Sequence, residues 1–333
     1  MLENIIDKIS IEYPKRVLND LLPNQMISSY TSTNGYLENI EFGSKNIRYK
    51  GSDYFVNPQE NQFIHFTSFE SAKEIISNNK LRLYDLNYAD DPHEIIFIIK
   101  NTGINFEIDY YKLKSLLYSM SFCSYPLSDD DEHTMWRLYG KDGYGIGLVC
   151  SFHNNCEEWD GFHLGKILYT NADKITEAFS KHKTFFEELN SDENHKTEIT
   201  EHHLLFNLLQ LFAFHKHTIY GTENEFRLLH KFNFLSLHNK DIRRVSTINK
   251  SRRLSNYTEL NLCELAKGKF ELDKSKEYSP LIKIDKLVLG YRYSLKEKEQ
   301  IDRVIQEVYA HNHSNYSTIK PKIEITSLKE KYF

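Results

Sequence analysis

The segment FIHFTSFESAKEIISNNKLRLYDL, residues 63–86, contains the pattern that decides the fold class. Its first apolar residues are typical of a strand, and Ser68 is a suitable N-cap because its hydroxyl can accept a hydrogen bond from the first helical turn. Ala72, Ile75 and Ile76 then recur at helical spacing, and the residues after Asn79 alternate as in a strand. The segment therefore predicts a strand, a helix and a second strand in direct succession.

Outside this segment, strands and helices follow one another without regular alternation. Strands are predicted over residues 120–124, 143–152, 225–232, 281–290 and 322–328. Helices are predicted over residues 5–22, 110–118, 204–215 and 293–311, around Trp136 and Tyr139, and as a polar pair between 171 and 200. This order is typical of an α+β fold with a mixed or antiparallel sheet, and not of a doubly wound parallel sheet.

The chain divides into a short extension and a larger domain. Residues 1–60 are predicted as an N-terminal helical and irregular extension, which ends at a polar boundary around Asn57 and Pro58. Residues 61–333 are predicted as one α+β domain with an insertion near 236–276. The basic residues of this insertion could dock an acceptor or a nucleic acid, although such runs are more often solvated loops. They are Lys240, Arg243, Arg244, Lys250, Arg252 and Arg253.

The composition is that of a folded protein in water, since 40% of the residues are hydrophobic and 27% are charged. A net charge of −5 excludes a general basic coat for nucleic acid. No apolar run reaches the roughly 18 residues of a membrane span, and the N-terminus lacks the uninterrupted apolar core of a signal peptide. The four cysteines form no CxxC pair, so we expect a cytoplasmic protein with reduced thiols.

Polar residues at two predicted strands could contact a ligand. His65 lies where the first core strand runs into a helix N-terminus, a place that suits a phosphate or a ribose, or else it is a half-buried structural histidine. Ser121 and Ser124 could hydrogen-bond a ligand or a neighbouring backbone. No GxSxG motif marks a serine nucleophile, and nothing in the sequence pairs Cys123 with a histidine.

A pair of carboxylates precedes the strand predicted over 225–232. Glu223 and Glu225 would share one face of an extended chain. One could stabilise a cationic transition state while the other orients the attacking group. The alternative is a solvated charge pair with Arg227 as its partner.

Other motifs point less clearly to chemistry. Residues 90–94, DDPHE, could bind Mg²⁺ or Mn²⁺, or could form an acidic turn without a ligand. The histidines lack the spacing of a zinc site with cysteines. Gly143, Gly145 and Gly147 are predicted within a strand, where they allow close backbone approach and are not a dinucleotide fingerprint.

Taken in order, these motifs resemble DUF2971, a bacterial family of unknown function. The resemblance spans about 61–291, and it departs from the family pattern at Asp90, where we expect Asn, and at Cys123, where we expect Ser. The matching stretches are His65-Phe66-Thr67-Ser68, Leu81-Arg82-Leu83, residues 90–94, residues 121–124, Trp136-Arg137-Leu138-Tyr139, residues 143–147, Glu223-x-Glu225-x-Arg227 and residues 287–290.

The same order is more loosely similar to the plan of the ADP-ribosyltransferases. That resemblance implies a split mixed or antiparallel sheet flanked by helices, NAD as substrate, and no metal. It implies catalytic roles for Glu225 and Glu223. The residues that it implies for NAD binding or for bracing the site are His65, Thr67, Ser121, Ser124, Trp136, Tyr139 and Arg227.

The function expected from this resemblance is an NAD-dependent ADP-ribosyltransferase or NAD glycohydrolase. It would act on an unknown macromolecular acceptor, a protein or a nucleic acid, as a toxin or an antiviral defence effector, and not at a membrane. One alternative is a metal-dependent nuclease in which carboxylates surround a divalent ion. These are Asp90, Asp91, Glu94, Glu223 and Glu225. Another is a non-enzymatic module that senses a nucleotide or a protein. The oligomeric state is left open.

Overall fold

The strand, helix and strand predicted over 63–86 are present in the computed structural model as β3 (Gln62–Thr67), α2 (Phe69–Asn78) and β4 (Lys80–Asp85). Ser68 caps α2 by accepting a hydrogen bond from the backbone N–H of Ser71 at 3.1 Å. Asn79 ends the helix in the left-handed conformation with a φ of 52°. The prediction for this segment is therefore confirmed, including its cap.

The structure describes residues 2–23, 25–33, 36–44, 49–57, 62–88, 94–102, 110–153, 159, 161–169, 173–191, 210–231, 244–248, 254–262, 265–266, 269–270, 279–312 and 321–329.

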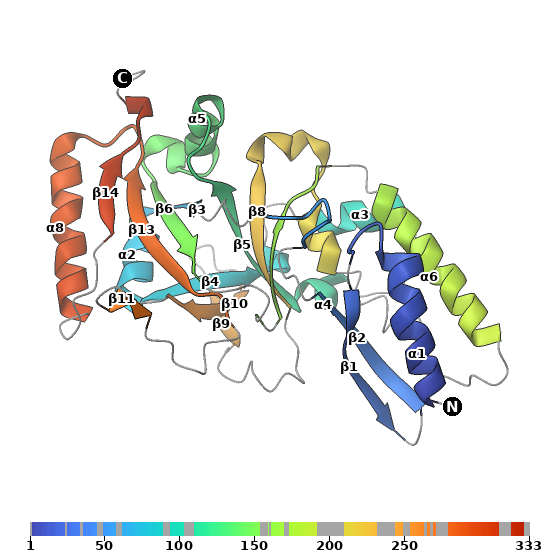
Figure 1. The fold of residues 1–333 in the computed structure, drawn as a ribbon. Coiled ribbons are helices and arrows are strands. Elements are labelled where there is room, and N and C mark those ends of the chain that lie inside the picture. Colours follow the sequence, from blue (N-terminus) through green and yellow to red (C-terminus); the bar gives the residue numbers. More distant parts are fainter. Residues whose placement is uncertain are drawn as a thin grey trace.

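A ten-stranded mixed sheet forms the centre of the molecule (Figure 1). Its main path runs β14-β13-β6-β3-β5-β4-β10-β9, and β8 joins it by pairing with both β5 and β7. Of its described pairs, β13 with β14 is parallel and the others are antiparallel. The remaining strands of this sheet are β5 (Leu117–Ser124), β6 (Ile146–Phe152), β7 (Phe162–Lys166), β8 (Glu225–Lys231), β9 (Arg244–Ile248), β10 (Leu254–Asn261), β13 (Ile282–Leu289) and β14 (Lys322–Ile325). The predicted α+β class with a mixed, largely antiparallel sheet is confirmed.

The sheet opens along one edge of β5. On its other edge, β5 pairs with β8 over seven residue pairs, from Leu117 to Cys123. On the open edge, β3 pairs with β5 at residues 123 and 124, whereas β4 pairs with it at residues 118 and 119. Residues 120–122 of β5 therefore have no partner in β3 or β4, and the two strands diverge from this point.

Apolar cores lie on both faces of the sheet, as alternation along β3 requires. Phe63 belongs to the core beneath α2 and α8 (Leu295–Asn312), which also contains Ile301 and Ile305 of α8. Ile64 belongs to the core beneath α5 (Asp129–Leu138), in which Trp136 is fully buried.

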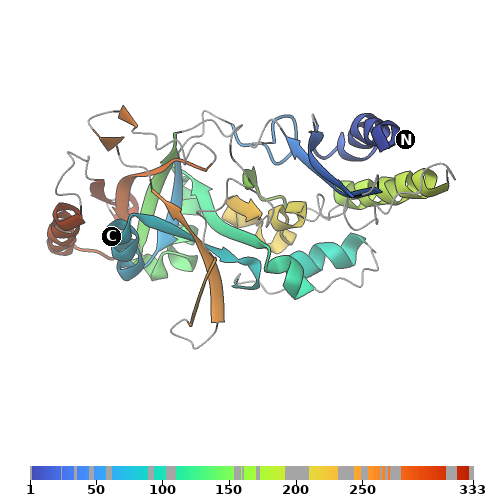
Figure 2. The ribbon, with the colours of Figure 1, turned by 90° about the horizontal axis from the view of Figure 1, so that it is seen from below.

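A second group of helices packs at the end of the sheet away from α8, where α1 and α6 lie together (Figures 1 and 2). Its apolar core joins the first residues of the chain to Phe212 and Phe214 and to Leu229 of β8. Its elements are α1 (Leu2–Tyr13), the π-helical turn η1 (Pro14–Leu18), α3 (Glu94–Thr102), α4 (Tyr110–Lys114), α6 (Asp173–Ser191) and the 3-10 helix η5 (Gln210–Phe214). The other short elements are η2 (Leu86–Tyr88), η3 (Lys141–Gly143) and η6 (Thr218–Glu223), with the hairpins β1 (Gln25–Thr33) with β2 (Tyr36–Ser44) and β11 (Leu265–Ala266) with β12 (Lys269–Phe270).

Some predicted boundaries were wrong. The helix predicted over 110–118 ends at Lys114, because Leu117 and Tyr118 already pair with β8. The strand predicted over 143–152 begins at Ile146, since Gly143 lies in a turn with a φ of +83°. Gly147 does allow close approach, as an added Cβ would lie 2.5 Å from Ile64 Cδ1.

The structure describes three further predicted segments in part. The described part of the helix predicted over 204–215 is the 3-10 helix η5, and residues 204–209 lie outside the described residues. Of the segment 171–200 the structure describes residues 173–191, which form α6, and the rest of the predicted pair lies outside the described residues. Within the segment 236–276, β10 pairs with β4 and so belongs to the main sheet. None of the helices that the structure describes is long and apolar enough to cross a membrane.

Candidate active site

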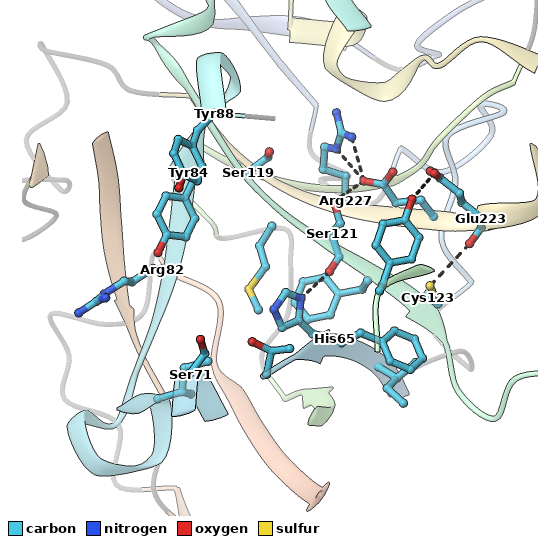
Figure 3. A pocket seen from close by; sticks show the side chains of 18 of the residues that line it. His65, Ser71, Arg82, Tyr84, Tyr88, Ser119, Ser121, Cys123, Glu223 and Arg227 are labelled. Carbon is cyan, nitrogen blue, oxygen red and sulfur yellow. Dashed lines mark hydrogen bonds and ion pairs between the residues drawn. The ribbon is translucent and has the colours of Figure 1, made fainter. Parts of the chain in front are cut away.

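A cleft of about 530 Å³ lies where the sheet opens. One wall comes from β3, α2 and β4, and the floor comes from residues 119–123 of β5. The opposite end is closed by Tyr139, Lys216, Glu223 and Glu225. Figure 3 shows Arg82, Tyr84 and Tyr88 at one end of this cleft and Glu223 and Arg227 at the other. Its volume is within the range of small-molecule sites.

Glu225, the first residue of β8, is the most constrained group of the cleft. Its Oε1 atom accepts hydrogen bonds from Ser121 Oγ at 2.5 Å and from Arg227 Nε and Nη2 at 3.0 and 2.8 Å. Its Oε2 atom lies 2.5 Å from Lys216 Nζ. The strand register explains the first contact, because β8 pairs Arg227 with Ser121 and Glu225 with Cys123. The backbone is held as well, since the N–H of Glu225 donates to Tyr169 Oη at 3.0 Å.

These contacts keep Glu225 ionised. Burial by itself raises the pKa of a carboxyl, but the charges of Arg227 and Lys216 and the hydrogen bonds from Lys216 and Ser121 outweigh it. The pKa of Glu225 is lowered from 4.5 to about 2. Because Oε1 already accepts from three donors, Oε2 is the oxygen that can accept a hydrogen bond from a ligand.

Glu223 also contacts Lys216, although its backbone is not extended as the sequence analysis predicted. It ends η6, and Asn224 adopts a left-handed φ of 43°, so the chain between the two glutamates is not extended. Both carboxylates nevertheless converge, since Lys216 Nζ lies 2.8 Å from Glu223 Oε2. The hydroxyl of Tyr139 donates to Glu223 Oε1. Burial and this bond raise the pKa of Tyr139, which keeps its proton.

The side chain of His65 extends from β3 to the backbone of β5 where the sheet opens. Its Nδ1 lies 2.9 Å from the backbone oxygen of Ser121, one of the residues of β5 without a partner in β3 or β4. A carbonyl can only accept, so Nδ1 carries the proton of this bond. Burial lowers the pKa of His65, although the bond to Ser121 opposes this, and the ring is neutral at pH 7. Nε2 is then a hydrogen-bond acceptor on a ring that lines the cleft.

The other residues predicted for the site are divided between the cleft and its surroundings. Thr67, Tyr139 and Arg227 line the cleft. Trp136 is fully buried beside Phe66, and its Nε1 donates to Glu132 at 3.3 Å. Arg227 is 2% exposed and lies beneath Glu225, where Nη1 also donates to the backbone oxygen of Ala213 at 2.5 Å.

Ser124 and Cys123 end β5 away from the opening. Ser124 pairs with Phe63 of β3 and is not among the residues that line the cleft. Cys123 lies at the end of the floor, where burial first, and Glu225 and Glu223 next, raise the pKa of its thiol. Its Sγ donates to the backbone oxygen of Glu223 at 3.6 Å. The thiol is therefore protonated and a poor nucleophile.

Some predicted groups lie where the structure gives no description. Residues 90–93 are outside the described residues, and nothing is described of the side chain of Glu94. Among the residues that are described, no cluster of three or more His, Cys, Asp or Glu side chains could hold a metal ion. Of the basic residues of the insertion, Arg244 is described in its backbone alone, and the other five lie outside the described residues.

The glutamates, Arg227, Tyr139 and Lys216 lie within one contiguous stretch of sequence. Residues 135–228 match the model of DUF2971, a protein family of unknown function. No match is found among curated proteins or among solved structures.

The DUF2971 match covers part of the span over which the motifs resemble that family. It includes the carboxylate end of the cleft, but not His65 or Ser121, which complete the site from β3 and β5. None of the comparisons links the chain to the ADP-ribosyltransferases.

Lys216 is the functional candidate that sequence reasoning missed. It lies in the short connection between η5 and η6, and its side chain is 14% exposed. A single lysine between two histidines carries no motif, so no sequence signal could have placed it between the two glutamates.

Proposed function

We propose that the protein cleaves NAD⁺ at its N-glycosidic bond and transfers the ADP-ribosyl group to a macromolecular acceptor. The observation that carries this proposal is the buried, ionised Glu225, which Ser121 and Arg227 hold at the floor of a cleft of about 530 Å³. A carboxylate fixed in this way is suited to stabilise positive charge that develops in a transition state.

Cleavage would proceed through an oxocarbenium-like ribose. The bond between C1′ and the pyridinium nitrogen breaks, and its electron pair leaves with nicotinamide as a neutral molecule. Oε2 of Glu225 accepts the hydrogen bond of the 2′-hydroxyl and faces the positive charge on the sugar. The acceptor nucleophile, or water, then attacks C1′ and gives its proton to Glu223, the second carboxylate of the cluster.

Other groups of the cleft would position the two halves of the substrate. His65 Nε2, an acceptor by its tautomer, suits a hydroxyl of the adenosine ribose. Tyr139 is 37% exposed and lines the cleft, so its ring is placed to stack on nicotinamide. The stacking role considered for Trp136 would fall to Tyr139, because Trp136 is fully buried.

The proposed setting is a cytoplasmic effector, a toxin or an antiviral defence protein, with a protein or nucleic acid as acceptor. This chemistry calls for no metal ion, and assays in EDTA test that point directly. The first experiment measures cleavage of NAD⁺ alone, so its result does not depend on the acceptor or on the setting.

The test is nicotinamide release from NAD⁺ labelled on its adenine side, in EDTA, with and without cell extract. Wild type is compared with Glu225→Gln, which keeps the shape of the side chain and removes its charge. We expect Glu225→Gln to lower release at least about 100-fold, as for other lost transition-state contacts. The control is Glu188→Gln, the same change in an exposed pair with Arg16, which should leave release unchanged.

Three results would redirect the assignment. Equal release by wild type and Glu225→Gln would refute the catalytic role of Glu225. Phosphodiester cleavage that needs Mn²⁺ and proceeds without NAD⁺ would favour a nuclease. Tight nucleotide binding that survives Glu225→Gln, without any release, would favour a sensor module.

A further inference from the structure

The cluster at the end of the cleft is electrically balanced. Two carboxylates, Glu223 and Glu225, face two cations, Lys216 and Arg227, and every one of these side chains is at most 14% exposed. A developing oxocarbenium ion is stabilised by net negative charge nearby. With both cations in place, the cluster offers the transition state no net negative charge.

The two cations differ in how firmly they are held. Arg227 lies within β8 with a 3% exposed side chain, donates twice to Glu225 Oε1, and is tied to Ala213. Lys216 lies between two short 3-10 helices, is the most exposed of the four, and lines the cleft. Its ammonium is a point charge on a flexible stem, whereas the guanidinium of Arg227 is fixed by its planar fork.

Lys216 also occupies the atom that a substrate would need. Its Nζ lies 2.5 Å from Glu225 Oε2, the oxygen left for a ligand hydroxyl. A carboxylate oxygen has room for a second donor, but the ammonium covers one side of it, and a ribose gains full access once the ammonium turns aside. The ring of Tyr220, with its centroid 5.8 Å from Nζ, borders the same part of the cleft and offers a second favourable contact on the way.

The cations at the other end of the cleft are already engaged with acids. Lys80 Nζ lies 2.7 Å from Glu259, and Arg82 lies 3.7 Å from Glu74 and 3.8 Å from Glu259. Lys216 is paired with acids as well, at 2.8 and 2.5 Å, but it is the cation that lies against Oε2 of Glu225, so it is placed to reach a phosphate on a ribose held there.

We propose that Lys216 is an anion-operated latch, which covers Glu225 in the free protein and moves to the 5′-phosphate of the ribose that Glu225 binds. This inference rests on the proposed function and adds the substrate class: a pyridine nucleotide with a phosphate on that ribose, and not the bare nucleoside. Once the ammonium pairs with the phosphate, the remaining three groups carry a net negative charge beside C1′.

Two ligands that differ by that phosphate alone test the latch. Dissociation constants for nicotinamide riboside and nicotinamide mononucleotide are measured by titration calorimetry at 4 °C, and nicotinamide release from NAD⁺ is followed with the same protein preparations. Wild type should bind the mononucleotide at least about tenfold more tightly than the riboside. Lys216→Met should weaken the mononucleotide and strengthen the riboside, because the carboxylates are then uncovered and the riboside is a cation.

Controls separate the latch from a structural role. Lys216→Arg retains the charge and should keep the preference for the mononucleotide. Lys174→Met removes an exposed lysine paired with Asp53 and should change neither constant. Lys216→Gln replaces the methionine variant if circular dichroism shows that the latter does not fold, since an amide can still hydrogen-bond both glutamates.

The possible outcomes separate the latch from the proposed cleavage of NAD⁺. If wild type releases nicotinamide but Lys216→Met leaves the ratio of the two constants unchanged, the latch is wrong and the proposed function stands. If the ratio changes as expected and nicotinamide is never released, the latch stands and the cleavage is wrong. If wild type binds neither ligand, the latch is overturned, and nicotinamide release from NAD⁺ still decides the proposed function.

Discussion

The stability of the protein should depend on pH through Glu225, and the size of the effect follows from its surroundings. Burial raises the pKa of this carboxyl, but Arg227 and Lys216 overcome it and lower the pKa from 4.5 to about 2. A group whose pKa is lower in the folded state stabilises that state at pH values above 4.5. The stabilisation is lost as the pH falls through the folded value. The difference between the two pKa values, 4.5 and about 2, stabilises the folded state by about 3 kcal/mol at pH 7.

The perturbation is Glu225→Gln, because glutamine resembles the protonated carboxyl in shape and charge. The variant should therefore be less stable than wild type by about 3 kcal/mol at pH 7. The difference should shrink to about 1 kcal/mol at pH 3, since wild type loses the contribution that the variant never had.

The assay is urea denaturation followed by circular dichroism at pH 7, 5, 4 and 3, with the two free energies of unfolding subtracted at each pH. The subtraction removes the contributions of other carboxylates. Glu188→Gln is the control, because its ion pair with Arg16 also lowers the pKa of Glu188 but is exposed to solvent, so a much smaller trend is expected. A difference that stays constant from pH 7 to pH 3 would refute the reasoning, since it would show that the charge of Glu225 does not carry the stability.

Three further predictions follow from single residues. His65→Ala should raise the dissociation constant for NAD⁺ at least about tenfold and change the melting temperature little, whereas an unchanged constant would make His65 a structural residue. Gly143→Ala should lower the free energy of unfolding in urea by about 1–3 kcal/mol, because φ is +83° and a Cβ would lie 2.6 Å from Tyr291 Cζ; a variant as stable as wild type would contradict this. Cys123 should resist iodoacetamide at pH 8 in the native protein and react after unfolding in urea, as read by mass spectrometry, because burial raises its thiol pKa; rapid native labelling would contradict this.

Local sequence patterns predicted the elements well where one face of a segment is apolar and its ends carry clear signals. Ser68 and Asn79 bracket α2 as expected, and the strand predicted over 225–232 is β8 within one residue. The helix predicted over 110–118 was wrong at its C-terminal end, because Leu117 and Tyr118 belong to β5 and pair with β8. That pairing depends on residues more than a hundred positions away, so no local pattern could show it.

The sequence predicted which residues form the site better than it predicted how they are arranged. His65, Ser121 and Glu225 do meet, through the bond of His65 to Ser121 and that of Ser121 to Glu225. The sequence analysis placed Glu223 and Glu225 on one face of an extended chain, but the left-handed conformation of Asn224 interrupts that chain. Lys216 had no signal, although it contacts both glutamates.

The sequence by itself determined the elements, the α+β class and the short list of polar residues from which a site could be built. These follow from periodicity, capping and residue chemistry, which act over a few positions of the chain. Only the tertiary structure decided that β3 and β4 diverge from β5, and that Lys216 and Arg227 balance the charge of the two glutamates. Strand pairing and the charge around a buried carboxylate depend on which distant segments come into contact, and a single sequence read in order does not contain those contacts.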